Sequence, residues 1–322
     1  MLQVDTVKNS LKKELIYGCM SLGGSWDTNP LSANDILTAE KAIEAALASE
    51  ITIFDHADIY KLGKAEVVFG KILHNSSSLR DKITLQSKAG IRYHEGLKGS
   101  NIYDLSKTYL LEQVDAILKR LQTDYLDIFL LHRPDPLLNP EEIGETFRIL
   151  KESGKVRSFG VSNMSLHQIK GIQKFCDEPL VTNQIQLSLG HSQMIDSGVL
   201  VNRTNNTDFN GVEGLLEYAQ IHDLAIQAYS PLDGGKFTGK LDLASNEEKE
   251  TIQLIDQLSE KYNTSVESIV LAWLFKIPGI IQPVIGTKNI ERIKACKDAV
   301  DLELSRVDWY NLWIMARGQK IP

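Results

Sequence analysis

Short apolar runs rich in β-branched residues alternate along the chain with longer stretches in which apolar and polar positions follow a helical period. The apolar runs are five to eight residues long, which is typical of buried strands. They predict eight strands, over Leu15–Cys19, Ile51–His56, Ile83–Ala89, Tyr125–His132, Val156–Ser162, Val181–Leu187, Ala225–Tyr229 and Ile280–Ile285.

Amphipathic stretches separate these runs. In residues 106–121, for example, Leu110, Val114 and Ile117 recur at intervals of four and three, the helical period. The stretch from Pro140 opens with two glutamates and stops before Gly154, a favourable start and end for a helix. The predicted helices are Ala33–Ser49, Lys64–Leu73, Ser106–Leu121, Pro140–Ser153, Leu166–Cys176, Val212–His222, Glu247–Tyr262 with Ser265–Lys276, and Asn289–Ala299.

A strand followed by a helix, repeated eight times, predicts a closed (β/α)8 TIM barrel formed as a single domain by residues 1–322. An open doubly wound sheet is the alternative, but it needs a glycine-rich phosphate turn after its first strand. Residues 18–24 read GCMSLGG, which does not fit that turn. The long irregular stretches all follow a strand, so in a barrel they surround the C-terminal mouth. They are Ser21–Pro30, Gly90–Asp104, Gly190–Asn210 and Leu232–Asn246.

The composition narrows the class of protein. Of the 322 residues, 43% are hydrophobic, and 35 basic against 42 acidic side chains give a net charge of -7. An acidic chain without a basic run predicts no nucleic-acid partner. Since no apolar stretch approaches the roughly 18 residues of a membrane helix, and the first residues do not form a signal peptide, we expect no membrane association and no secretion.

The cysteines and histidines indicate the compartment. Cys19, Cys176 and Cys296 are odd in number and far apart, which predicts neither a disulfide framework nor a cysteine metal site. The seven histidines also lack metal-ligand spacing. We therefore expect a protein of the reducing cytoplasm without a bound metal.

Chemically active side chains stand at the ends of three consecutive predicted strands. Asp55 and Tyr60 follow the second strand, Lys88 ends the third and His132 ends the fourth. A single lysine or histidine at such a position is most often a solvated cap or a satisfied polar neighbour. Because the carboxyl ends of barrel strands meet at one mouth, four such groups together predict a site.

Proton donation to a carbonyl group, as a hydride arrives, needs these four residue types. A tyrosine titrates near 10 and is a poor acid, but a neighbouring ammonium lowers its pKa. A carboxylate keeps that ammonium charged, and a neutral imidazole can hold the carbonyl oxygen toward the phenol. General acid help of this kind contributes about 10²–10⁴-fold. None of these groups carries a hydride, so a diffusible cofactor is required.

At these residues the sequence resembles the aldo-keto reductase superfamily over nearly its whole length. The motifs are FDHADIY at 54–60, LQSK at 85–88, DIFLLHRP at 127–134, GKVRSFGVSN at 154–163, NQIQ at 183–186, AYSPL at 228–232 and IGTKNIERI at 285–293. The HRPDP run at 132–136, the GGKF segment at 234–237 and a closing helix around Trp309 resemble a little-characterised bacterial branch of oxidoreductases. The resemblance implies a monomeric barrel that acts on a small-molecule carbonyl substrate.

The resemblance also implies roles for individual residues. Tyr60 would be the general acid, Lys88 its pKa partner, Asp55 the partner of Lys88, and His132 the group that orients the carbonyl. The implied cofactor is NADP(H). Its nicotinamide carboxamide would be held by Ser162, Asn163 and Gln184, its nicotinamide ring would stack on Tyr229, its pyrophosphate would lie by Ser230 and Leu232, and its adenosine end by Gly286, Thr287, Lys288 and Arg292.

The chain departs from the family pattern at the adenosine end. Many members have Lys-Ser where this chain has Gly286-Thr287, so one cationic contact is missing unless Lys288 replaces it. Two positions that are often acidic and amide here read Ala295 and Cys296. NADPH is therefore expected over NADH, chiefly through Arg292.

Four further residues near these motifs receive other interpretations. His56 and Asp58 are interpreted as groups that shape the Tyr60 loop, and Cys19 as a small core residue. Trp26 in the first long loop is interpreted equally as a lid over the cofactor or as a packing residue.

Two other functions remain open. Lys88 at a strand end could serve as the nucleophile of a Schiff-base lyase, although Asp55 would keep it protonated. The barrel could also bind its cofactor as a regulatory or accessory protein without significant turnover. The sequence does not identify the substrate; the loop at 190–210 is polar, so a polar compound and an aromatic aldehyde are both consistent with it.

Overall fold

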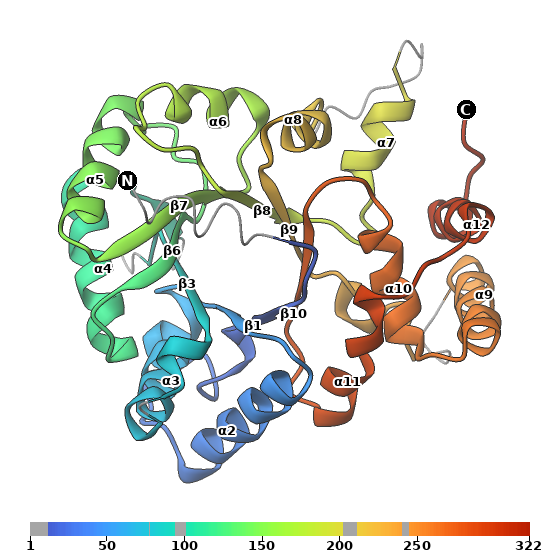
Figure 1. The fold of residues 1–322 in the computed structure, drawn as a ribbon, viewed down its shortest axis with the longest axis horizontal. Coiled ribbons are helices and arrows are strands. Elements are labelled where there is room, and N and C mark those ends of the chain that lie inside the picture. The colour runs from blue at the N-terminus through green and yellow to red at the C-terminus, as the bar shows by residue number, and fades with distance from the viewer. Residues whose placement is uncertain (1–11, 77, 94–100, 202–210, 240–244) are drawn as a thin grey trace.

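Eight parallel strands close into a barrel in the computed structural model, which describes residues 12–76, 78–93, 101–201, 211–239 and 245–322 (Figure 1). The order around the barrel is β1-β10-β9-β8-β7-β6-β3-β2. This confirms the predicted (β/α)8 fold, and every predicted strand overlaps an observed one. The barrel strands are β1 Ile16–Gly18, β2 Ile53–Asp55, β3 Thr84–Ala89, β6 Leu126–Leu131, β7 Val156–Ser162, β8 Thr182–Gln186, β9 Ala225–Tyr229 and β10 Ile281–Ile285.

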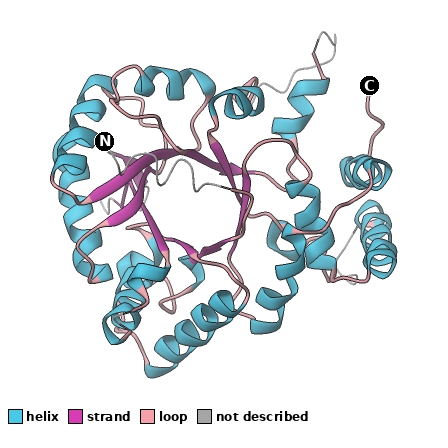
Figure 2. Cartoon of the chain, viewed as in Figure 1, coloured by secondary structure: helices cyan, strands magenta, loops and turns pink. Residues whose placement is uncertain are grey.

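Helices surround the barrel, and most of them cover the outward, apolar side of the strands (Figure 2). Serine caps begin several of them; Ser32, Ser165 and Ser245 each form a capping box with the residue three positions later. The helices are α2 Ala33–Ala48, α3 Lys64–Asn75, α4 Lys107–Leu121, α5 Pro140–Glu152, α6 Leu166–Gln173, α7 Gln193–Val199, α8 Leu215–His222, α9 Asn246–Tyr262, α10 Val266–Phe275, α11 Ile290–Ala295 and α12 Arg306–Arg317.

Two stretches that we predicted to be irregular contain regular structure. Residues 90–104 include an antiparallel hairpin of β4 Ile91–Tyr93 and β5 Asn101–Tyr103, with Ile91 opposite Tyr103. Residues 190–210 include α7, which Asp196 attaches to α12 because its carboxylate accepts the Trp313 indole N–H at 2.9 Å. These segments are too short for a period to be visible in the sequence. Residues 202–210, which belong to the loop described above as polar, lie outside the described residues.

The predicted helix at 289–299 is also shorter than expected. It divides into α11 and a 3₁₀ turn over Lys297–Val300.

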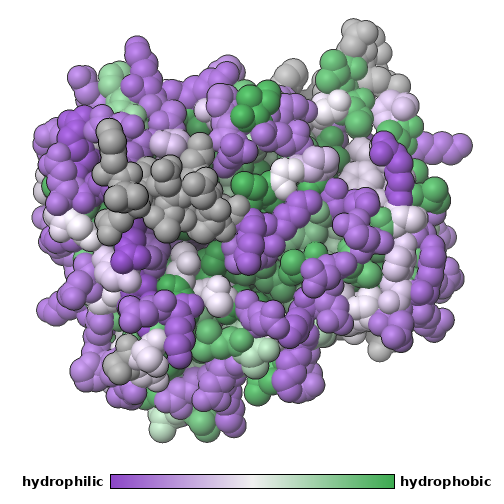
Figure 3. Space-filling view, viewed as in Figure 1, coloured by the Kyte–Doolittle hydropathy of each residue, from purple (hydrophilic) through white to green (hydrophobic). Residues whose placement is uncertain are grey.

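Helices α9 and α12 lie outside the ring, next to α10 (Figure 1). Trp273 of α10 and Trp309 of α12 stack with ring centroids 5.3 Å apart, and each indole N–H donates to the other's backbone carbonyl. These tryptophans are therefore packing residues. Polar residues cover most of the face seen in Figure 3, with apolar residues gathered in patches between helices. Within the described ranges, no helix has the length and apolar character needed to cross a membrane.

Strand pleating decides which side chains enter the barrel. In β3, alternate residues point to opposite sides. Ser87 points outward, where its hydroxyl donates to Glu66 of α3 at 2.6 Å. Gln86 and Lys88 therefore point inward, and Asp55 at the end of β2 is in register with Gln86. The polar centre of the barrel follows from this alternation.

Candidate functional site

A buried ion pair lies inside the C-terminal end of the barrel. The Lys88 ammonium donates to both carboxylate oxygens of Asp55 at 2.7 Å and to the His56 backbone carbonyl at 2.7 Å. Lys88 and Asp55 are 0% and 1% exposed. With all three lysine protons directed at acceptors, the ammonium is fixed in one position.

Tyr60 and His132 lie above this pair. Tyr60 begins the 3₁₀ turn Tyr60–Gly63 that follows β2, and the Lys88 Nζ is 4.9 Å from the centre of its ring. His132 comes directly after β6, and its ring centroid is 6.0 Å from that of Tyr60, with the rings nearly perpendicular. The structure thus brings the four predicted residues together.

The acidity of Tyr60 differs from the sequence prediction. We expected the Lys88 ammonium to bring the pKa of Tyr60 below its ordinary value. Burial has the larger effect and raises the pKa of Tyr60, while Lys88 acts in the opposite direction. The phenol is therefore fully protonated at neutral pH.

Lys88 keeps its proton as predicted. Burial alone would lower the pKa of the Lys88 ammonium, but Asp55 and Tyr60 together raise it above its ordinary value. A Schiff-base lyase needs a neutral amine, so this environment opposes that alternative.

His132 provides a neutral imidazole. Burial, followed by the charges of Lys88 and Arg133, holds the pKa of His132 well below its usual range. The backbone fixes the residue, since its N–H donates to the Ala89 carbonyl at 2.8 Å. Its Nδ1 is buried and has no hydrogen-bond partner among the described residues.

A cavity of about 560 Å³ opens above these side chains. Asp55, Tyr60 and His132 line it, and Lys88 lies beneath its floor. All but one of the predicted cofactor contacts also line it, namely Ser162, Asn163, Gln184, Tyr229, Ser230, Leu232, Gly286, Thr287 and Arg292. Lys288 is the exception: it is exposed and does not line this cavity, so the structure does not place it where the missing cation would be.

Hydrogen bonds between strand ends make one wall of this cavity rigid. The Tyr229 hydroxyl donates to the Asn163 side-chain oxygen at 3.0 Å, and the Asn163 amide donates to the Ser162 hydroxyl at 2.9 Å. Ser162 in turn donates to the Gln184 backbone carbonyl at 2.8 Å. Asn163 has a positive φ of 57°, which asparagine tolerates better than most residues. The wall therefore joins β7, β8 and β9 through side chains.

Arg292 lies at the far end of the cavity. Its Nε pairs with Glu267 at 3.0 Å, and its Nη2 donates to the Thr238 hydroxyl at 2.7 Å. A Cβ added at Gly286, which also lines the cavity, would meet the Gly18 carbonyl oxygen at an ordinary contact distance of 3.8 Å. An anchored guanidinium with free N–H groups can hold an anionic group by charge-assisted hydrogen bonds.

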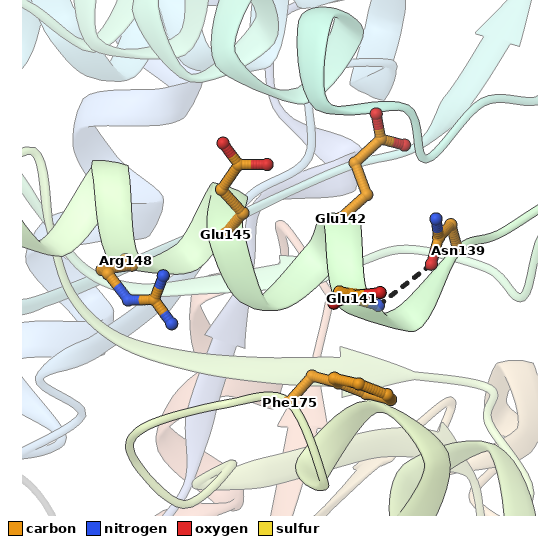
Figure 4. A pocket seen from close by; sticks show the side chains of 6 residues that line it. All are labelled: Asn139, Glu141, Glu142, Glu145, Arg148 and Phe175. Atoms are coloured by element: carbon orange, nitrogen blue, oxygen red, sulfur yellow. Dashed lines mark hydrogen bonds between the residues drawn. The ribbon is translucent and has the colours of Figure 1, made fainter.

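A second hollow of about 570 Å³ lies on the outer surface along α5 (Figure 4). Half of its lining residues are glutamates, and Arg148 within it is paired with Asp177 at 2.8 Å. It lies far from the strand ends and contains none of the predicted residues. We therefore place the candidate active site in the barrel mouth, the usual location in this fold.

The other residues singled out in the sequence have mainly structural surroundings. His56 is buried with its ring edge-on to Phe69 at 4.6 Å, and burial lowers its pKa to about 3. Burial and the nearby Glu66 raise the pKa of Asp58 to about 7. Burial likewise raises the pKa of the Cys19 thiol. Trp26 is 51% exposed, with the Lys61 ammonium 5.2 Å from its ring, so it lies on the surface and does not pack in the core.

Three residues that lie in or beneath the site were not predicted from the sequence. Arg133 lines the cavity next to His132 and makes no ion pair or hydrogen bond with the described residues. Gln86 and Gln227 lie under the ion pair. The glutamines could have been noticed as polar residues at inward positions of apolar strands. Among the described residues, no group of His, Cys, Asp and Glu side chains could hold a metal ion.

Comparison with known proteins identifies the family of the chain. Residues 14–313 match the profile of the Aldo/keto reductase family. The chain is 35% identical over 303 residues to the uncharacterised oxidoreductase YcsN of Bacillus subtilis, covering 93% of this chain and 94% of that protein. It is 33% identical over 310 residues to the 6-dehydroglucose reductase of Agrobacterium fabrum, covering 95% of each.

The fold is also that of a solved enzyme. An aldo/keto reductase from Klebsiella pneumoniae, in complex with NADP and acetate, superposes with a TM-score of 0.68 at 24% sequence identity. The superposition covers 92% of this chain and 89% of that one. At this identity the likeness concerns the fold.

Proposed function

Because the chain belongs to the aldo/keto reductase family and is an oxidoreductase, we propose that it reduces an aldehyde or ketone to an alcohol with NADP(H), using Tyr60 as general acid. One observation carries this proposal. Tyr60 and His132 border the same cavity directly above a fully buried Lys88–Asp55 pair. A phenol, an imidazole and an ammonium in this order are the groups that protonation of a carbonyl oxygen requires.

The cavity is suited to NADP(H), which supplies or accepts the hydride when bound. It runs from Tyr60 to Arg292, and so joins a proton-donating end to a cationic end. We propose that Tyr229 contacts the nicotinamide side, and that Arg292 holds the phosphate on the adenosine ribose. The NADP complex of the Klebsiella pneumoniae reductase supports this cofactor.

The chain's own residues would divide the proton chemistry. The neutral His132 imidazole would donate a hydrogen bond to the carbonyl oxygen and orient it toward Tyr60. The Tyr60 phenol would give its proton to that oxygen as negative charge develops there. Lys88, kept charged by Asp55, would then stabilise the phenolate that remains. Solvent would return the proton to Tyr60 before the next turnover.

A polar aldehyde is the substrate class that we propose to test first. Arg133 lies beside His132 in the cavity lining and makes no ion pair or hydrogen bond with the residues that the structure describes, and a guanidinium binds carboxylates or several hydroxyl oxygens well. One relative, from Agrobacterium fabrum, is named a 6-dehydroglucose reductase, which acts on a sugar aldehyde. Hexose-derived aldehydes therefore belong in the first panel, next to an aromatic aldehyde.

The test is carbonyl-dependent oxidation of NADPH, followed by absorbance, for the wild type and Tyr60→Phe. We expect Tyr60→Phe to keep the fold and the NADPH affinity and to lose roughly 10²–10⁴-fold in kcat. Near-normal turnover in Tyr60→Phe would remove it from the general-acid role. NADPH binding without turnover of any activated aldehyde would favour the regulatory alternative, and a borohydride-trapped adduct would favour a lyase.

A further inference from the structure

Four buried glutamines lie in the barrel interior around the ion pair. They are Gln86 of β3, Gln184 of β8, Gln227 of β9 and Gln282 of β10, and none is more than 2% exposed. Branched apolar residues dominate this part of a TIM barrel. Burying an amide is costly unless all of its polar atoms find partners, so a layer of four requires an explanation.

Hydrogen bonds from this layer converge on one atom, Asp55 Oδ1. Gln86 Nε2 donates to it at 2.6 Å and Gln184 Nε2 at 3.1 Å, in addition to Lys88 at 2.7 Å. An ionised carboxylate only accepts hydrogen bonds, so it fixes the orientation of both amides with their nitrogens toward Asp55. The carboxylate of the proposed catalytic ion pair is therefore held by two neutral donors as well as by its cation.

Gln227 holds both donors in that orientation. Its Oε1 accepts from Gln86 at 2.8 Å and from Gln184 at 3.0 Å, and its Nε2 donates back to Gln86 Oε1 at 2.9 Å. Since Gln86 and Gln227 exchange hydrogen bonds in both directions, neither amide can turn over without breaking the other's contacts. The three amides and Asp55 thus form one network.

Gln282 extends the network away from the site. Gln227 Nε2 donates to its Oε1 at 3.4 Å, and its own amide donates to the Lys12 backbone carbonyl at 3.1 Å, toward the base of the barrel. Gln282 is as buried as the others but makes no hydrogen bond with Asp55. It is therefore a matched control for the loss of a buried amide.

We propose that Gln86 and Gln227 are positioning residues for the reduction. They act through Asp55: they fix its carboxylate, and hence the Lys88 ammonium, under Tyr60. This inference rests on the proposed function. Neutral donors suit the task because they stabilise the carboxylate without adding a cation that would compete with Lys88 for it. Charge-assisted hydrogen bonds inside a buried network are strong and strongly directional.

The experiment is a double-mutant cycle between Gln86→Met and Asp55→Asn, measured as kcat for NADPH-dependent carbonyl reduction. Methionine has nearly the length of glutamine and no amide. In the wild-type background, Gln86→Met should lower kcat roughly ten- to hundredfold, because one hydrogen bond to a charged group is lost. In the Asp55→Asn background it should change kcat by no more than about twofold.

Gln282→Met, combined with Asp55→Asn in the same way, is the control cycle. The pH profile of each variant is a second readout. If the loss of a buried amide acts only through the structure, Gln282→Met should lower kcat as much as Gln86→Met does. The loss should then also be the same in the wild-type and Asp55→Asn backgrounds. The Asp55 charge raises the pKa of Tyr60, and the hydrogen bonds that Gln86 and Gln184 donate to Asp55 disperse that charge. In Gln86→Met the high-pH decline of reduction should therefore move upward, whereas Gln282→Met should keep the wild-type midpoint.

Equal losses from Gln86→Met in both backgrounds, with an unmoved pH midpoint, would overturn the inference while leaving the proposed function intact. If Gln86→Met does not fold, Gln227→Met gives the same test, since it removes the amide that orients Gln86. If the wild type reduces no carbonyl compound, or Tyr60→Phe is as active as the wild type, the proposed function fails and the inference fails with it.

Discussion

Removal of the Lys88 charge should show how strongly the site stabilises the Tyr60 phenolate. We consider Lys88→Met. The Nζ lies 4.9 Å from the centre of the Tyr60 ring, so at an effective dielectric constant of about 20 the attraction to a phenolate is about 3 kcal/mol. That energy corresponds to roughly a hundredfold in rate if it is expressed fully in the transition state.

Loss of stability must be separated from loss of chemistry in this variant. Lys88→Met leaves the Asp55 carboxylate buried without its cation, and breaking a buried pair costs about 3–5 kcal/mol. The double variant Lys88→Met/Asp55→Asn removes both charges. It should recover most of the stability, measured by urea unfolding, without recovering kcat.

The assay is reduction of a carbonyl substrate at saturating NADPH, with NADPH affinity measured separately by fluorescence. We expect a loss of about hundredfold in kcat, with NADPH affinity and substrate KM little changed, because the lost interaction forms only as the proton leaves Tyr60. A folded Lys88→Met enzyme within about threefold of the wild type would show that Lys88 does not stabilise the phenolate, and the proposed mechanism would fail.

Four further outcomes follow from the same geometry. Reduction by the wild type should stay level through neutral pH and decline only above the ordinary tyrosine value of about 10, because the acid acts while protonated and burial raises the pKa of Tyr60; a decline near pH 8 would contradict this. Arg292→Ala should weaken NADPH far more than NADH in fluorescence titrations, whereas equal losses would show that Arg292 does not bind the ribose phosphate. Arg133→Met should raise KM several-fold for an anionic or polyhydroxylated aldehyde and leave KM for an uncharged aromatic aldehyde unchanged; parallel changes would exclude a role in specificity. Asp58→Asn should stabilise the protein to urea more at pH 8 than at pH 5, since the pKa of Asp58 is raised from 3.8 to about 7 on folding, so the penalty grows as pH rises between these values and is complete only above pH 7; the same gain at both pH values would refute it.

The barrel and the convergence of the four site residues could be predicted from sequence because both follow from local patterns. Alternating strand and helix periods define the barrel, and the ends of parallel strands necessarily meet. Asp55, Lys88 and His132 each end a strand, so their proximity needs no knowledge of packing. That the whole chain is one domain, that the protein is a monomer and that it resides in the cytoplasm stay predictions.

Features that depend on burial or on side-chain direction could not be predicted. The pKa of Tyr60 is set more by desolvation than by Lys88, and the degree of burial is not visible in a motif. Lys288 follows Thr287 in the sequence, yet past the end of β10 its side chain is exposed and lies outside the cavity lining. The contacts among the inward glutamines depend on the stagger of strands across the barrel, which no single strand encodes.

In the proposed mechanism, the charges of the site would explain how a tyrosine with a raised pKa can still act as the acid. Before reaction, the Lys88–Asp55 pair, the protonated Tyr60 and the neutral His132 carry no net charge between them. Proton transfer creates one new anion, the phenolate, next to an ammonium already held by fixed acceptors. The alkoxide that forms on the substrate is a stronger base than a phenolate, so transfer is favourable although the phenol is weakly acidic. Because the attraction between Lys88 and the phenolate would exist only once the proton has moved, the proposed arrangement would stabilise the transition state over the bound substrate, which is the condition for raising kcat.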